Sequence, residues 1–169
     1  MNAPDFSKTL KLLPNRDDHN CFGCSPSNQS GLQMKFYTDD TRVYSRLSVP
    51  EHLCGWNTLV HGGVISTILD EIMSWGAIYL LRQIVLTKSI SVDFLQPIMI
   101  NEDIRVEGKV LERTGEREAV MQGFIYNDKG VLAARSTGIF ALFSPDVLRE
   151  KGIMSDKDIQ YFEMMMLNN

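Results

Sequence analysis

The sequence predicts an α+β domain in which one antiparallel sheet curls around a single long helix. Two strand-like segments precede the helix and four follow it, and turn residues separate consecutive segments. The helix carries apolar residues on most of its circumference, so one flat sheet face would leave part of it uncovered. We therefore expect the sheet to be curved and part of the helix surface to be covered by a second subunit.

Residues 1–31 form a predicted N-terminal extension, in which prolines and glycines mark turns and one short helix is expected at 6–12. The first two strands are expected at 32–38 and 42–49, because apolar and polar residues alternate along both segments. The residues between them, "DDT", are typical of a turn. The two strands are therefore predicted to form a hairpin.

The central helix is predicted from a change in the spacing of apolar residues. After Gly63 this spacing becomes three or four residues, which indicates a mostly buried helix that ends near Arg82. The positions that define it are Ile65, Ile68, Leu69, Ile72, Trp75, Gly76 and Tyr79.

Four strand-like segments follow the helix, separated by the turn sequences "QP", "RTGE" and "NDKG". Two helix-start signals, "SPDV" and "SDKD", then predict a helical tail over 144–169. The expected division is an extension at 1–31, one domain at 32–143 and the tail. The four strands are expected at 86–95, 103–113, 118–127 and 131–143.

The composition is that of one ordinary globular domain, with 169 residues of which 44% are hydrophobic and 22% are charged. Lysine and arginine number 17 against 21 aspartates and glutamates, so the net charge of −4 argues against nucleic acid or an anionic membrane as a partner. The N-terminus lacks the apolar core of a signal peptide, and no segment approaches the roughly 18 uncharged apolar residues of a membrane span. We expect a cytoplasmic protein.

Three cysteines cannot all pair within one chain, which fits a reducing compartment. The sequences "CFGC" and "HLC" together offer four zinc ligands, Cys21, Cys24, His52 and Cys54. The second pair lacks the usual two-residue spacer, which favours the alternative that "CFGC" is a glycine turn with one buried thiol. We therefore expect no metal at these residues.

The sequence "HGG", His61 to Gly63, lies where the central helix is predicted to begin. Glycines allow a ligand to approach the backbone closely, and the first turn of a helix has unpaired N–H donors at its positive end. Such a helix start can hold an oxyanion or a polarised carbonyl group. The simpler alternative is a turn that merely leads into the helix.

Asp70 lies nine residues after His61, in the interior of the apolar helix. A carboxylate there is costly unless it is hydrogen-bonded, and its helical neighbours Ser66, Thr67 and Ser74 could form a polar strip beside it. Either this strip leaves room for water or substrate, or Asp70 simply bonds back to a hydroxyl group. Glu71, about 100° further round the helix, is expected to be the exposed neighbour.

The spacing of these groups also bears on subunit structure. From Gly62 to Asp70 is eight residues, or about 12 Å at the helical rise, too far for both to reach one carbonyl carbon. If both groups act, the backbone N–H of one subunit must face the aspartate of another. The spacing therefore predicts a dimer with active sites across its interface.

Several segments resemble the hotdog-fold acyl-CoA thioesterases, in the branch of the 4-hydroxybenzoyl-CoA and phenylacetic-acid-pathway thioesterases. These segments are "GWNTLVHGGVISTILDEIMSW", "TKSISVDFLQPI", "NEDIRVEGKVLER" and "DKGVLAARSTGIFALF". The upstream "CFGCSPSNQSGLQMKFY" is similar to the start of the fold in one group of these proteins. The resemblance covers about residues 20–143, and its most specific part is "HGG" followed by Asp70 at this spacing.

The resemblance implies a hotdog fold, a curled antiparallel sheet wrapped round one long helix, in homodimers that often pair into tetramers. It implies hydrolysis of acyl-CoA to a free acid and CoA without metal or organic cofactor. Asp70 would be the catalytic carboxylate, the Gly62 N–H would polarise the thioester carbonyl, and His61 would lie beside it. The candidate substrate-binding residues are Gly63, Asn57, Thr67, Ser74 and Lys88.

One residue departs from the family pattern. Many relatives carry an asparagine six residues before the histidine, where this chain has Gly55, with Asn57 four residues before it. Two other functions remain open at this point: a non-catalytic module that binds an acyl group or acyl-CoA, and an enoyl-CoA hydratase on the same fold. Asp70 as general base and Asp70 as nucleophile are equally compatible with the sequence, which also leaves the acyl group undetermined.

Overall fold

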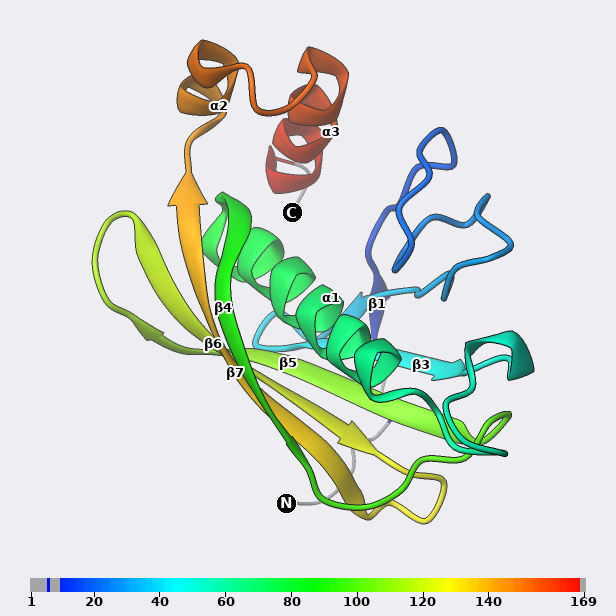
Figure 1. Ribbon diagram of the computed structural model, residues 1–169. Helices are drawn as coiled ribbons and strands as arrows, with labels where there is room; N and C mark the ends of the chain where they lie inside the picture. The colour runs from blue at the N-terminus through cyan, green and yellow to red at the C-terminus, as the bar shows by residue number, and fades with distance from the viewer. Residues whose placement is uncertain (1–5, 7–9, 168–169) are drawn as a thin grey trace.

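The computed structural model describes residue 6 and residues 10–167, and in that part of the chain seven strands form one antiparallel sheet that curls round helix α1 (Gly62–Leu81) (Figure 1). The strand order is β1-β2-β3-β5-β6-β7-β4. The predicted fold class is thereby confirmed. The strands are β1 (Lys11–Leu12), β2 (Tyr37–Thr38), β3 (Val43–Ser48), β4 (Ile84–Phe94), β5 (Asp103–Arg113), β6 (Glu118–Tyr126) and β7 (Leu132–Phe143).

The predicted helix and the four strands after it are confirmed, each with bounds within two residues of those expected. The hairpin of β2 and β3 also forms, with Tyr37 opposite Tyr44, but β2 is only two residues long. The short helix expected at 6–12 is wrong at Lys11–Leu12, which pair with β2 as strand β1, and residues 7–9 lie outside the described part.

The alternation over 32–36 that predicted a longer strand has another cause. Leu32, Met34 and Phe36 are buried, but the backbone N–H groups of Leu32 and Met34 donate to the carbonyls of Phe22 and Gly23. These residues therefore hold the "CFGC" loop in place instead of extending the sheet. Alternating burial arises here from packing against α1, and Phe36 stacks on Trp75 with ring centroids 4.4 Å apart.

Helix α1 forms the centre of the core, with eleven buried residues. A Cβ atom at Gly108 of β5 would come within 2.6 Å of the Ile72 carbonyl oxygen. Only glycine at this position therefore allows α1 to lie directly on the sheet. By length and composition alone α1 could cross a membrane, but 61% of the relevant window is buried. Its apolar character is therefore accounted for by packing inside the curled sheet.

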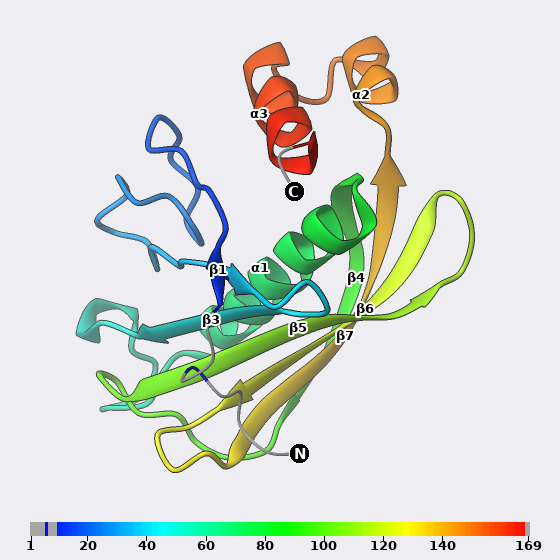
Figure 2. The same cartoon turned by 180° about the vertical axis from the view of Figure 1, so that it is seen from behind.

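The C-terminal tail forms helices α2 (Pro145–Lys151) and α3 (Asp156–Leu167), and a 3₁₀ turn, η1 (Glu51–Leu53), follows β3. Helix α3 lies near the C-terminal end of α1, beside the N-terminal extension (Figure 2). The Tyr161 hydroxyl donates to the Pro14 carbonyl at 2.6 Å, and Arg16 forms an ion pair with Asp158. Extension and tail are therefore bound to each other over one side of α1.

Candidate active site

The start of α1 has one available backbone donor. His61 is the N-cap residue, with φ −62° and ψ 136°, and its Nδ1 accepts the Gly63 N–H at 3.0 Å. The next two N–H groups, of Val64 and Ile65, donate to the His61 carbonyl. Within the described residues, the exposed Gly62 N–H has no protein acceptor. The "HGG" sequence is thus both a turn into the helix and a site with a free donor at the positive helix end.

An apolar hollow of about 330 Å³ lies against this donor. A Cβ atom at Gly62 would lie 3.7 Å from the Phe94 ring, so the glycine backbone forms part of the wall. Phe94 is 56% exposed and Leu95 42% exposed, which is unusual for side chains of this size in a group. Such a surface suits an apolar ligand or a second subunit. The other lining residues are Leu59, Val60, Ile65, Gln96, Pro97 and Ile98.

Asp70 is half-buried on α1, and its hydrogen-bond partner comes from the sheet. The Thr87 hydroxyl, on β4, donates to Asp70 Oδ1 at 2.8 Å. Burial raises the pKa of Asp70, and the Thr87 hydrogen bond opposes that shift. The carboxylate is therefore held in a fixed orientation in a partly desolvated place. Thr87 was not among the expected site residues, because nothing in the strand pattern indicates which helix residue it faces.

Two hydroxyls of the polar strip expected along α1 bond to the helix backbone and not to Asp70. Ser66 and Thr67 donate to the backbone carbonyls of Gly62 and Gly63, each at 3.0 Å. Hydroxyls inside a helix can satisfy the preceding turn in this way, and here that leaves Asp70 to a partner on another element. Ser74 lines a different cavity, together with Glu71.

Glu71 was expected to be exposed, and this too is wrong. The N-terminal extension folds over it, and the Cys21 thiol donates to Glu71 Oε1 at 3.4 Å. Burial is the main cause that raises the pKa of Glu71 to about 8, and a thiolate at Cys21 would add to that shift. Two adjacent acidic residues of one helix therefore face different surroundings.

Two further candidates, Lys88 and Asn57, form no hydrogen bond or ion pair with Asp70 in the part of the chain that the structure describes. Lys88 forms an ion pair with Glu118, and Asn57 is exposed in a turn with φ 52°. The four-ligand zinc set does not form, because His52 Nε2 lies 3.3 Å from the Ser30 carbonyl oxygen and Cys54 is exposed, outside the cluster of Cys21 and Cys24. The roles of Lys88 and Asn57 in substrate binding stay predictions.

Residues 57–134 match the family model described as Thioesterase superfamily. The chain is 28% identical over 95 residues to acyl-coenzyme A thioesterase THEM4 of Rattus norvegicus. That alignment covers 56% of this chain and 40% of the rat protein, so the chain spans less than half the length of this relative.

Solved structures share the fold. A hypothetical thioesterase from Streptococcus pneumoniae, solved with coenzyme A, has a TM-score of 0.58 and 21% identity over 62% of this chain and 80% of its own. The PaaI protein of the E. coli phenylacetic acid degradation operon has a TM-score of 0.60 and 16% identity, over 67% and 81%. At these identities the likeness shows the fold alone.

Proposed function

The chain belongs to the thioesterase superfamily through its hotdog region, and from this premise we propose that it hydrolyses acyl-CoA thioesters to a free acid and CoA. The observation that carries the proposal is that helix α1 presents both a free backbone donor and an oriented carboxylate. The free Gly62 N–H lies at the positive end of α1, and the Thr87-bound carboxylate of Asp70 lies further along it. These are the two groups that acyl transfer to water requires.

The proposed chemistry follows from the charges. A thioester carbonyl beside the Gly62 N–H gains a hydrogen bond and the field of the helix start as negative charge develops on its oxygen. Asp70 either removes a proton from an attacking water, or attacks the carbonyl carbon itself to give a mixed anhydride that water then hydrolyses. In both routes the C–S bond breaks and CoA leaves as a thiolate, which takes up a proton. In both routes the Thr87 hydroxyl orients the carboxylate. Neither route needs a cofactor.

The active unit in this proposal is a homodimer. Helix α1 is continuous from Gly62 to Leu81, so the Gly62 N–H and Asp70 of one chain are about 12 Å apart. Strand β4 ends the sheet, and most of its residues from Leu86 to Phe94 are exposed. A second copy on this side would place its Gly62 near Asp70 and would cover the apolar hollow. Further pairing into a tetramer remains an expectation from the family resemblance.

The substrate proposal rests on the apolar hollow and on the relatives. Its exposed Phe94 and Leu95 suit an acyl group, and the S. pneumoniae neighbour was solved with coenzyme A. A binding module that lacks turnover would gain nothing from an oriented, partly buried carboxylate.

The test is release of free thiol from a panel of short, long, aromatic and 2-enoyl acyl-CoAs, with native protein and with Asp70→Asn. We expect release with the native chain and a loss of about 10²–10⁴-fold in kcat with the variant, because it keeps the shape but not the charge. Equal rates would rule out Asp70 as the catalyst. Binding without release would instead indicate a binding module, and loss of an enoyl chromophore without thiol release would indicate a hydratase.

A further inference from the structure

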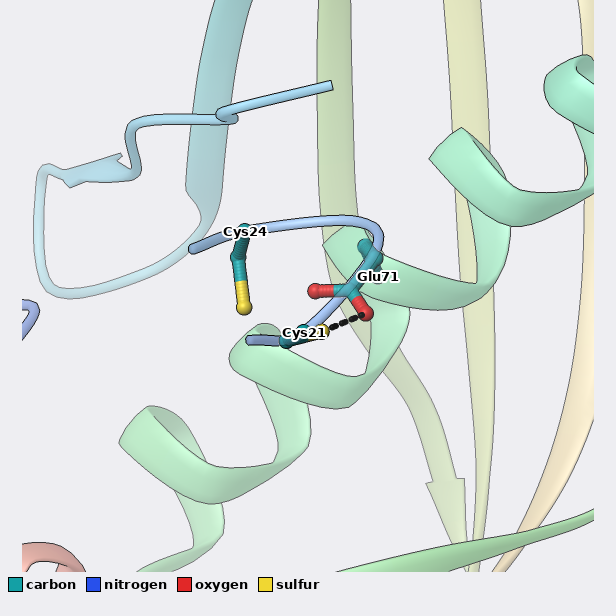
Figure 3. A group of neighbouring side chains, drawn as sticks. All are labelled: Cys21, Cys24 and Glu71. Atoms are coloured by element: carbon teal, nitrogen blue, oxygen red, sulfur yellow. Dashed lines mark hydrogen bonds between the residues drawn. The ribbon is translucent and has the colours of Figure 1, made fainter. Parts of the chain in front are cut away.

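The "CFGC" loop brings two thiols onto the side chain of Glu71. Figure 3 shows Cys21 and Cys24 of the loop and Glu71 of α1 pointing toward one another. One ligand atom from each lies within 4.8 Å of the other two, and Cys21 Sγ is 3.4 Å from Glu71 Oε1. Cys24 is buried, and Cys21 and Glu71 are half-buried. The proposed hydrolysis uses none of these three residues.

The loop is shaped to bring these groups together. A Cβ atom at Gly23 would lie 2.3 Å from Glu71 Cγ and Cδ, so only glycine lets the loop close on the carboxylate. The Phe22 and Gly23 carbonyls accept hydrogen bonds from Leu32 and Met34 at 2.9 and 3.0 Å. The Cys21 carbonyl accepts the Ser25 N–H at 3.2 Å, and the Cys24 carbonyl accepts the Asn15 side-chain amide at 2.6 Å. Both sulfurs are therefore positioned by a fixed backbone.

The cluster holds three acidic groups without a basic partner. Among the described residues, no lysine, arginine or histidine forms an ion pair with Glu71. Arg16 lines the adjoining cavity, but it is paired with Asp18 and Asp158. The charged forms of these groups are costly out of water unless a counter-charge compensates them. A bound cation would supply that charge.

We propose that Cys21, Cys24 and Glu71 bind one Zn²⁺ ion through two thiolates and one carboxylate. Thiolates favour zinc over magnesium or calcium, and two cysteines are too few for an iron–sulfur cluster. The two-residue spacing of the cysteines is that of common zinc sites. This proposal is independent of the thioesterase proposal, because it concerns another face of α1.

The three side chains line a cavity of about 220 Å³ between α1, α3 and the extension, from which a fourth ligand would come. Trp75, Ile78 and Phe162 contribute its apolar wall. His19 also lines it, but its Nδ1 already accepts the Cys21 N–H at 3.3 Å and its Nε2 lies 3.2 Å from Asn15 Oδ1. Water therefore completes the tetrahedron in this assignment. The ion would link the N-terminal extension to α1.

The test measures metal binding directly on the full chain, purified under reducing conditions, stripped with a chelator and titrated with Zn²⁺ and with Co²⁺. Zinc content is measured by elemental analysis and native mass spectrometry, and Co²⁺ reports thiolate ligation through its charge-transfer absorption. The variants are Glu71→Gln and Cys24→Ser. Cys54→Ser is the matched control, because Cys54 is exposed and outside the cluster.

We expect one zinc ion per chain in native protein and in Cys54→Ser. Zinc affinity should fall about 100-fold or more in Glu71→Gln, because loss of a group that only hydrogen-bonds to a metal ligand already costs 10–100-fold. The Co²⁺ charge-transfer band should weaken in Cys24→Ser; if that variant fails to fold, the isosteric Glu71→Gln carries the test. Zinc well below one per chain in native protein, a Cys21–Cys24 disulfide in its place under reducing conditions, or unchanged affinity in Glu71→Gln would each overturn the proposal.

Discussion

Asp70 and Glu71 are consecutive residues of α1, yet they lie on different sides of the helix. Asp70 is on a side with exposed neighbours, the open side, and Glu71 is on a side covered by the N-terminal extension, the closed side. Asp70 lies against Thr87 of the edge strand β4, beside residues that are largely exposed. Glu71 lies under the "CFGC" loop, next to a cavity closed by α3. A rotation of about 100° along one helix is enough to separate the two environments.

The two sides of α1 differ in whether segments of the same chain cover them. On the Glu71 side, extension and tail bind each other through Tyr161 and Pro14 and through Arg16 and Asp158. On the Asp70 side, the sheet ends at β4 and the apolar hollow stays uncovered. We therefore expect changes on the open side to affect turnover, and changes on the closed side to affect stability and metal content.

After the loss of the Asp70 carboxylate, the largest effect is expected at the helix start. Gly62→Pro removes the N–H donor, while proline is well tolerated at the first helical position and His61, at φ −62° and ψ 136°, suits a following proline. We expect kcat for thiol release to fall about 10²–10³-fold, because a lost oxyanion donor costs this much.

Gly62→Ala is the matched control for that variant. It keeps the N–H, and its Cβ would lie in ordinary contact with Phe94 at 3.7 Å. The alanine variant should therefore retain near-native kcat. Equal losses in both variants would show that space at Gly62 matters and the donor does not.

A partial recovery is expected when the two halves of the open site come from different chains. Asp70→Asn and Gly62→Pro proteins, unfolded and refolded together in equal amounts, should regain about a quarter of native activity. Half of the dimers are then hybrids, and each hybrid has one intact site of two. Each protein refolded alone is the control. No recovery, with hybrid dimers present by mass spectrometry, would place both groups of a site in one subunit.

The smallest effect is expected on the closed side. Tyr161→Phe removes the hydroxyl that donates to the Pro14 carbonyl and leaves the ring in place. The free energy of unfolding should fall by about 1 kcal/mol in denaturant titrations, the usual contribution of one such hydrogen bond. The kcat should stay at the native value. A large loss of kcat would contradict the separation of the two sides.

The elements that sequence periodicity predicted best are those whose neighbours impose one regular pattern. Helix α1 and strands β4 to β7 show the repeat of 3.6 or of two over nine or more residues, and each contributes apolar residues to one continuous core. The segment 32–36 has the repeat of two without the strand, because its backbone bonds to the "CFGC" loop. The alternation of apolar residues indicates which side chains are buried, but it does not show that the segment belongs to a sheet.

The sequence by itself determined the fold class, the position of α1, and the spacing from "HGG" to Asp70, because all of these depend on residues within one or a few turns of one another. Only the tertiary structure decided that Thr87 holds Asp70, that Ser66 and Thr67 do not, and that Glu71 meets two cysteines some fifty residues earlier. Those contacts join segments far apart in the chain. They depend on how the sheet and the extension fold over α1, and the periodicity of the sequence does not indicate this.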